Sequence, residues 1–215
     1  VLVSGGVDST VAGRLMLEAL PKEQVHLMFI DTGLLREGER DQVERALGGA
    51  GAQHLHIIDA RDEFLSALSG TVDPEEKRRI IGDLFITVQE REIAEHIPGD
   101  YFLVQGTLYT DLIESGRGIG RNARVIKTHH NVGSPLVARK REQGRVIEPL
   151  DGLYKDEVRR LGALLHVPQD TLERHPFPGP GLAVRILGEV TPQRCETLRR
   201  VDSILVDELR RRGLY

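Results

Sequence analysis

Residues 1–10, Val-Leu-Val-Ser-Gly-Gly-Val-Asp-Ser-Thr, decide the fold of this chain. The first three residues are apolar and β-prone, which predicts a short buried strand. Residues 4–9 contain adjacent glycines and predict a turn, and residues 10–20 carry apolar side chains at helical spacing. A strand, a glycine turn and a helix in this order predict the first unit of a parallel α/β sheet.

The same alternation of strands and helices continues along the chain. Because strands that alternate with helices form parallel sheets covered on both faces, we expect a doubly wound α/β fold. The expected strands are residues 25–30, 54–58, 101–104 and 146–149, and the expected helices are residues 39–47, 74–97, 155–165 and 192–212.

The composition of the sequence changes near its end. Residues 175–181, HPFPGPG, are rich in proline and glycine, which excludes a helix or a central strand and favours a domain junction. We expect one domain over residues 1–185 and the beginning of a second module over residues 186–215. The inward face of the last helix is expected to consist of Leu198, Val201, Leu205 and Leu209.

Composition narrows the class of protein. The 215 residues contain 29 Lys and Arg against 33 Asp and Glu, a net charge of −4 that offers no bulk attraction to nucleic acid or to an anionic membrane. No apolar stretch is long enough to span a bilayer. A single cysteine and the lack of a leader favour the cytoplasm. Since the chain opens directly on a strand without a methionine, we expect it to be a segment of a longer protein.

The glycine loop, residues 4–10, has the chemistry of an anion site. Gly5 and Gly6 allow positive φ, so that successive N–H groups can point into one concavity at the start of a helix. The spacing matches neither a Walker A loop nor a dinucleotide-binding loop. Asp8 would repel a bound phosphate unless a divalent cation lay between them, so this residue is either a Mg²⁺ ligand or a helix N-cap.

This loop resembles the pyrophosphate loop of the N-type ATP pyrophosphatases. Within that superfamily, five further blocks are similar to the synthetase part of the GMP synthetases, and together they cover most of the chain. The blocks are PEEKRRIIGD (residues 74–83), VQGTLYTDLIESG (104–116), IKTHHNVG (126–133), EPLDGLYKDEVR (148–159) and HPFPGPGLAVRILGE (175–189).

The resemblance implies a fold of the adenine nucleotide alpha hydrolase type, followed by the start of a C-terminal dimerisation module. It implies that ATP and Mg²⁺ are bound and that XMP is aminated to GMP through an adenylyl-XMP intermediate, with release of AMP and pyrophosphate. The ammonia would come from a glutamine amidotransferase domain or subunit outside this chain. A homodimer of the full-length protein is also implied.

The resemblance also implies roles for individual residues, each of which has a plainer interpretation. From sequence alone, Lys127 and its neighbours form a polar turn or, less favourably, a metal site, and the other charged residues are ordinary surface groups or caps. The implied ATP-binding residues are Ser4, Gly5, Gly6, Val7, Asp8, Ser9, Thr10 and Lys155. The implied catalytic residues are Asp8, Lys127, His129, His130, Asp111 and Glu114, with Asp8 as Mg²⁺ ligand and Arg78 as a partner of the XMP phosphate.

Two other function classes remain open at this stage. One is another enzyme of the same superfamily, such as an NAD synthetase or a tRNA-thiolating enzyme. The other is a non-catalytic module that binds adenine nucleotides, although Lys127, Asp111 and Glu114 argue against a pure binder. Cys195 lies in a helical pattern without a neighbouring histidine, so the chain itself lacks the nucleophile of an amidotransferase.

Overall fold

The structure is a computed structural model that describes residues 1–97, 99–114 and 135–215. Parallel strands form its central layer. β1 pairs with β2 residue for residue, from His26 opposite His54 to Asp31 opposite Asp59, and β3 pairs with β4 as a second two-stranded sheet. The strands are β1 (His26–Asp31), β2 (His54–Asp59), β3 (Leu103–Val104) and β4 (Val146–Ile147).

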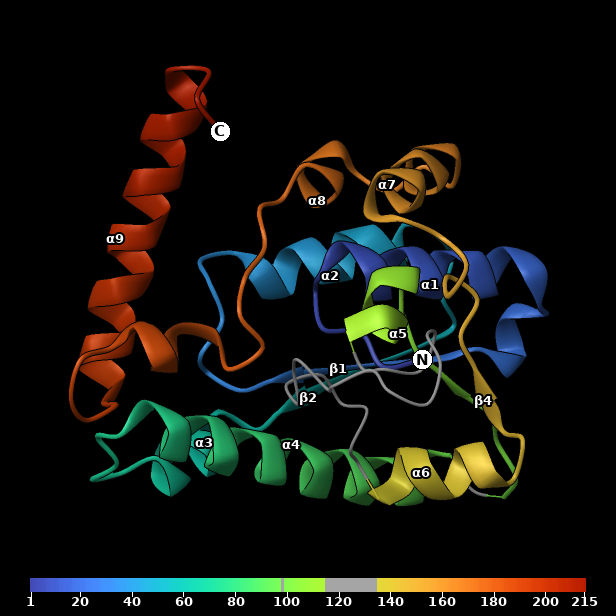
Figure 1. Ribbon diagram of the computed structural model, residues 1–215, viewed down its shortest axis with the longest axis horizontal. Coiled ribbons are helices and arrows are strands. Elements are labelled where there is room, and N and C mark those ends of the chain that lie inside the picture. The colour runs from blue at the N-terminus through green and yellow to red at the C-terminus, as the bar shows by residue number, and fades with distance from the viewer. Residues whose placement is uncertain (98, 115–134) are drawn as a thin grey trace.

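Helices cover both faces of these strands (Figure 1). α1, α2 and α7 lie on one face, and α3, α4 and α6 lie on the other. The α-helices are α1 (Val7–Ala19), α2 (Glu39–Gly48), α3 (Arg61–Ala67), α4 (Pro74–His96), α5 (Tyr109–Glu114), α6 (Pro135–Glu142), α7 (Lys155–Leu164), α8 (Gln169–Leu172) and α9 (Pro192–Arg211). Short 3₁₀ turns are η1 (Lys22–Gln24) and η3 (Gly181–Arg185).

The alternation of side chains along β1 explains the two covered faces. Leu27 and Phe29 pack into the core beneath α1 and α2, whereas Met28 packs with Ile93 of α4 on the opposite face. Successive strand residues point to opposite faces, so a strand buried on both sides reads as a continuous apolar run. The expectation of a parallel α/β fold is confirmed.

The beginning of the chain differs in detail from the expectation. Residues 1–3 run beside β1 but form a single parallel bridge, Leu2 with Met28, rather than a full strand. Helix α1 begins at Val7 and not at residue 10, because Gly6 is its extended N-cap (φ −75°, ψ 162°) and the Gly6 carbonyl accepts from the Thr10 N–H at 3.2 Å. Asp8 therefore lies inside the first turn, and its interpretation as an N-cap is wrong.

The end of the chain corrects the expected inward face of α9. Val201 and Leu205 are 54% and 56% exposed, whereas Cys195, Asp202 and Val206 are buried. The reason is electrostatic: the Asp202 carboxylate accepts hydrogen bonds from the guanidinium groups of Arg36 at 2.7 Å and Arg185 at 2.9 Å, which turns this acidic residue toward the body of the molecule.

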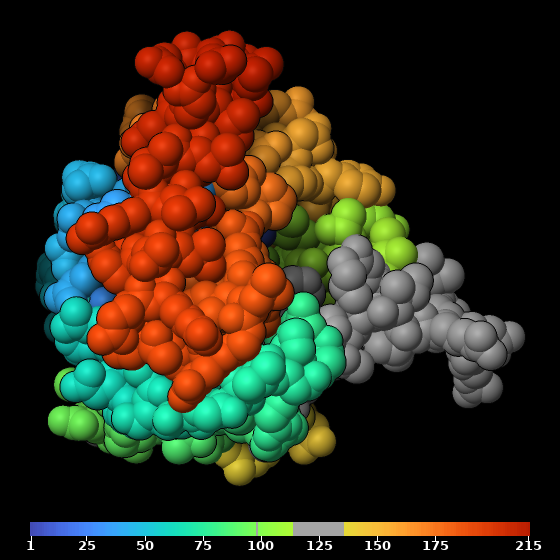
Figure 2. Space-filling model, turned by 90° about the vertical axis from the view of Figure 1, so that its left-hand side faces the viewer, coloured from blue at the N-terminus to red at the C-terminus, as the bar shows by residue number. Residues whose placement is uncertain are grey.

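Figure 2 shows the segment that ends in α9 covering one end of the molecule. The boundary at residues 185 and 186 stays a prediction. No helix within the described ranges is both long and apolar enough to cross a bilayer.

Candidate functional site

The glycine loop links the bridged residues 1–3 to α1, and its backbone is shaped by Gly5. Gly5 has a φ of 79°, a conformation that side-chain-bearing residues rarely adopt, and an added Cβ would lie 2.9 Å from the Glu39 carboxylate. The Ser9 hydroxyl accepts from the Ser4 N–H at 3.0 Å and lies 3.1 Å from the Ser4 hydroxyl. The Gly6 N–H donates to the Ser4 hydroxyl at 3.3 Å, so the loop folds back on itself.

The first turn of α1 supplies the electrostatic component of this site. N–H groups in the first turn of a helix have no intrahelical acceptors, and the aligned peptide dipoles add roughly half a positive charge at the N-terminus. The Thr10 hydroxyl donates to the Gly6 carbonyl at 2.8 Å, which fixes the junction between loop and helix. The arrangement suits a polyanion such as a pyrophosphate group.

Asp8 and Lys155 meet across this helix terminus. The Lys155 Nζ lies 2.7 Å from each Asp8 carboxylate oxygen, and the two side chains are 41% and 29% exposed. Lys155 is the first residue of α7, which packs against α1. The structure therefore brings together two residues that are 147 positions apart and were both predicted for the site.

A buried ion pair supports the loop from behind. The Arg174 guanidinium donates to the Gly5 carbonyl at 2.9 Å and lies 2.6 Å from the Glu39 carboxylate. Both side chains are almost fully buried, at 9% and 5% exposure. Glu39 also accepts from the Arg36 N–H at 3.0 Å. Arg174 thus holds the carbonyl of the one loop glycine that has positive φ.

The backbone after β3 closes the opposite side of the loop. A Cβ added to Gly106 would lie 2.8 Å from the Asp8 carbonyl carbon and 2.9 Å from the Ser9 nitrogen. No larger residue fits there without moving the beginning of α1. Sequence reasoning missed Glu39, Arg174 and Gly106; only Gly106 carried a signal, since it lies two residues beyond the end of a strand and glycine often marks a close backbone approach.

The remaining predicted residues are only partly placed. The Asp111 carboxylate accepts from the Leu108 N–H at 2.9 Å, near the beginning of α5. Lys127, His129 and His130 lie outside the described residues, as does the side chain of Glu114. Their roles stay predictions.

Arg78 is paired locally on α4, with a hydrogen bond to the Glu75 carboxylate. Among the described residues, no hydrogen bond or ion pair links Arg78 to the glycine loop. Its neighbour Lys77 is fully buried, and the Lys77 Nζ donates to the carbonyls of Ala183, Ile186 and Gly188. The three basic residues that begin at Lys77 thus do not form one solvated cluster.

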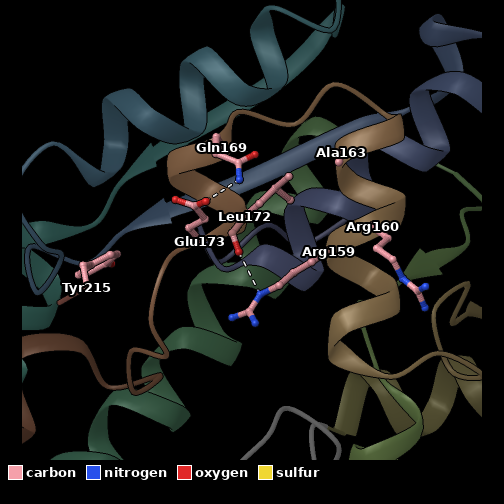
Figure 3. A pocket seen from close by; sticks show the side chains of 7 residues that line it. All are labelled: Arg159, Arg160, Ala163, Gln169, Leu172, Glu173 and Tyr215. Atoms are coloured by element: carbon pink, nitrogen blue, oxygen red, sulfur yellow. Dashed lines mark hydrogen bonds between the residues drawn. The ribbon is translucent and has the colours of Figure 1, made fainter. Parts of the chain in front are cut away.

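A surface hollow lies elsewhere, beside α7 and α8 (Figure 3). It has a volume of about 530 Å³, and no residue of the glycine loop lines it. Two of its polar side chains are engaged locally: Arg159 donates to the Leu172 carbonyl at 3.0 Å and Gln169 to the Glu173 carboxylate at 2.6 Å. The candidate site is therefore the open helix terminus and not this hollow.

Comparison with curated proteins gives long and uniform matches. The chain is 53% identical over 213 residues to the GMP synthase of Aquifex aeolicus and 50% identical over 217 residues to that of Saccharomyces cerevisiae. Each alignment covers 99% of this chain and 40% of the relative. Its relatives are glutamine-hydrolysing GMP synthases. The chain thus spans about 40% of the length of the GMP synthases it matches, and no family model matches it.

Comparison with solved structures supports the fold. The NMN synthetase from Francisella tularensis superimposes with a TM-score of 0.58 at 15% identity, covering 92% of this chain and 74% of the other. At that identity the match speaks only for the shared α/β architecture. The glycine loop, Asp8 and Lys155 thus lie in a segment that is about half identical to the matching part of these GMP synthases, and they stand on an α/β architecture that also occurs in the solved NMN synthetase.

Proposed function

We propose that this chain is the ATP pyrophosphatase part of a GMP synthase. In the proposed reaction the C2 oxygen of XMP attacks the α-phosphorus of ATP, pyrophosphate leaves, and ammonia displaces AMP from adenylyl-XMP to give GMP. The observation that carries the proposal is the Asp8–Lys155 pair at the N-terminus of α1, within a sequence about half identical to GMP synthases.

The glycine loop would bind the pyrophosphate portion of ATP. Backbone N–H groups in the first turn of α1 and the helix dipole would stabilise negative charge there, and they would do so most strongly as the leaving group gains charge. Lys155 lies within reach as a fixed cation. Arg174 and Gly106 touch the loop backbone rather than the nucleotide, so they act as positioning residues.

Mg²⁺ fits the oxygen chemistry of the loop. Asp8 offers a carboxylate that is partly exposed at the anion site, and Mg²⁺ is commonly held by one or two carboxylates together with substrate phosphates. Bound there, the ion would neutralise phosphate charge. Asp8 is the residue that would hold it, provided that Lys155 releases the carboxylate oxygens.

The other predicted groups complete the proposal. Lys127, His129 and His130 would approach the α-phosphate, Asp111 and Glu114 would assist activation of XMP, and Arg78 would bind the XMP phosphate. For Arg78 this requires an exchange of its present partner, Glu75. A planar guanidinium is suited to that role because it can contact two phosphate oxygens at once.

The nitrogen source and assembly also belong to the proposal. Cys195 is 2% exposed, and burial raises the pKa of its thiol, so the one cysteine of the chain is a poor nucleophile. Ammonia would therefore come from a glutamine amidotransferase module outside this chain. Residues 186–215 would begin the dimerisation module of a cytoplasmic homodimer.

The test measures pyrophosphate release by the whole protein with ATP, Mg²⁺ and ammonium. We expect release to depend on XMP, and not on nicotinate mononucleotide, nicotinate adenine dinucleotide or tRNA. Asp8→Asn and Lys155→Ala should each lower kcat/KM for ATP by at least a hundredfold. Asp83→Asn, which removes an exposed carboxylate that pairs with Arg79 on α4, serves as the control.

Two results would contradict the proposal. Release driven by one of the other substrates would assign the chain to a different enzyme of the superfamily. Unchanged kinetics in Asp8→Asn and Lys155→Ala would remove the glycine loop from the reaction.

A further inference from the structure

A series of buried polar contacts links α9 to the glycine loop. The Asp202 carboxylate on α9 accepts from the Arg36 Nε at 2.7 Å, and the Arg36 backbone N–H donates to the Glu39 carboxylate at 3.0 Å. Glu39 pairs in turn with the Arg174 guanidinium at 2.6 Å, and Arg174 donates to the Gly5 carbonyl at 2.9 Å. Taken in order, these contacts run from α9 to the backbone of the candidate ATP site.

The charged side chains of this series are removed from water. Asp202, Arg36, Glu39 and Arg174 each expose only 5–9% of the side chain. The cost of desolvation offsets most of the attraction within a buried ion pair, and replacement of such pairs by apolar residues is often neutral for stability. Stability alone therefore does not account for this network, and its end point at Gly5 indicates a role at the glycine loop.

Within the part of the chain that the structure describes, three guanidinium groups share two carboxylates in this network. Asp202 pairs with Arg36 and with Arg185, and Glu39 pairs with Arg174. The Arg185 side chain is 37% exposed, so water can solvate its charge. The Arg36 side chain is only 9% exposed, so its charge depends on Asp202. Loss of the Asp202 charge would leave a buried guanidinium without its anion.

The nearest alternative anion for Arg36 along the chain of contacts is Glu39. It lies three residues away and already accepts from the Arg36 backbone, and its burial makes the attraction strong because the effective dielectric constant is low there. An Arg36 guanidinium that turned to Glu39 would compete with Arg174 for one carboxylate. Because Arg174 holds the Gly5 carbonyl, this competition would loosen the residue whose φ of 79° shapes the loop.

An aromatic ring helps to keep Arg36 beside Asp202. The guanidinium carbons of Arg36 and Arg185 lie over the Phe177 ring, at 5.2 and 4.7 Å from its centroid. A guanidinium within about 6 Å of a ring centroid is attracted to the face of the ring. Phe177 belongs to the proline- and glycine-rich residues 175–181, so this segment supports the network from a third side.

We propose that Asp202 is a positioning residue for the ATP site: it keeps the Arg36 guanidinium away from Glu39, and so leaves Glu39 to Arg174 and Arg174 to Gly5. The inference rests on the proposed function of the glycine loop as the site for the pyrophosphate portion of ATP. Asp202 lies within residues 186–215, the segment expected to begin a second module. That segment would therefore shape the nucleotide site from outside the glycine loop's own domain.

The test compares Asp202→Asn with the double variant Asp202→Asn/Arg36→Met in the whole protein. Calorimetric titration with MgATP measures nucleotide affinity without XMP. We expect Asp202→Asn to weaken MgATP binding by about fivefold or more. The double variant should return to within about twofold of the wild type, because it has no buried Arg36 charge that competes for Glu39. In steady-state assays the KM for ATP should follow this pattern, while the KM for ammonium, which does not bind the glycine loop, should stay unchanged.

Two further variants serve as references. Asp207→Asn makes the same change at an exposed residue of α9 and should bind MgATP as the wild type does. Arg36→Met leaves Asp202 paired with Arg185 and should bind within about twofold of the wild type. If Asp202→Asn does not fold, the double variant is compared with Arg36→Met, and the proposal requires equal affinities.

Three results would overturn the proposal. In the first, folded Asp202→Asn binds MgATP as tightly as the wild type, which refutes the positioning role and leaves the proposed function intact. In the second, the double variant binds as weakly as Asp202→Asn, or more weakly than Arg36→Met, so that Asp202 does not act through Arg36. In the third, the wild type binds no MgATP, and the proposed function falls together with this inference.

Discussion

Replacement of Arg174 by methionine tests how the glycine loop is held. The substitution keeps most of the side-chain volume but removes the charge that faces Glu39 at 2.6 Å and the donor to the Gly5 carbonyl at 2.9 Å. Because Glu39 is only 5% exposed, its carboxylate would remain buried with the Arg36 N–H as its remaining donor. Breaking a buried pair from one side costs about 3–5 kcal/mol.

That cost is a large share of the roughly 5–15 kcal/mol that stabilises a typical domain. We expect the free energy of unfolding of Arg174→Met to fall by about 3–5 kcal/mol, and the affinity for ATP to fall as well because Gly5 loses its support. Urea unfolding followed by circular dichroism measures the first quantity, which suits a chain without tryptophan. Calorimetric titration with ATP under folding conditions measures the second.

Two comparisons make the result decisive. Arg79→Met removes two ion pairs, with Glu76 and with Asp83, that are exposed on both sides and should cost less than about 1 kcal/mol. The double variant Arg174→Met with Glu39→Gln also removes the buried, unpaired charge of Glu39, and it should recover a substantial part of the stability lost by the single change. The reasoning is refuted if Arg174→Met costs no more than Arg79→Met, or if the double variant recovers nothing.

Three further predictions address other contacts. Gly106→Ala places a Cβ against the backbone of α1 and should raise the KM for ATP at least tenfold, whereas Gly82→Ala, with open space at that position in α4, should leave KM unchanged and slightly raise the thermal midpoint. Lys77→Met removes the donor to three backbone carbonyls and should speed amide hydrogen exchange around residues 181–188. Unaltered exchange would contradict the role of Lys77 in holding this segment. The Arg61 guanidinium lowers the pKa of Asp59 from 3.8 to about 2. The stability that this ion pair contributes is therefore complete above pH 3.8 and is lost as the pH falls toward 2. In Arg61→Ala, the pKa of Asp59 measured by NMR should move back toward 3.8.

The sequence predicted what depends on local pattern. Apolar runs and their flanking glycines and prolines located β1, β2, α2 and α4 to within a residue or two. Pairing Asp8 with Lys155 could not be derived from spacing, because the two helices that carry them meet only in the folded chain. The resemblance to a known family supplied that candidate pair instead.

Errors arose where a polar group is paired across the fold. Periodicity assigned Val201 and Leu205 to the inner face of α9, but the ion pairs of Asp202 with Arg36 and Arg185 outweigh the apolar pattern. Lys77 is buried as well, and its spacing of four residues from Ile81 agrees with a place on the buried stripe of α4. Long-range partners of charged residues leave little trace in a single sequence.

The contact between Asp8 and Lys155 has a thermodynamic consequence for the proposed enzyme. Each residue currently neutralises the other, so a nucleotide that attracts Lys155 frees a carboxylate for a cation, and a cation on Asp8 frees an ammonium group for phosphate. Either ligand therefore removes part of the energetic cost of admitting the other. Linkage requires the two affinities to rise by the same factor. This one ion pair therefore lowers the affinity for ATP alone and for the metal alone, and it favours binding of their complex.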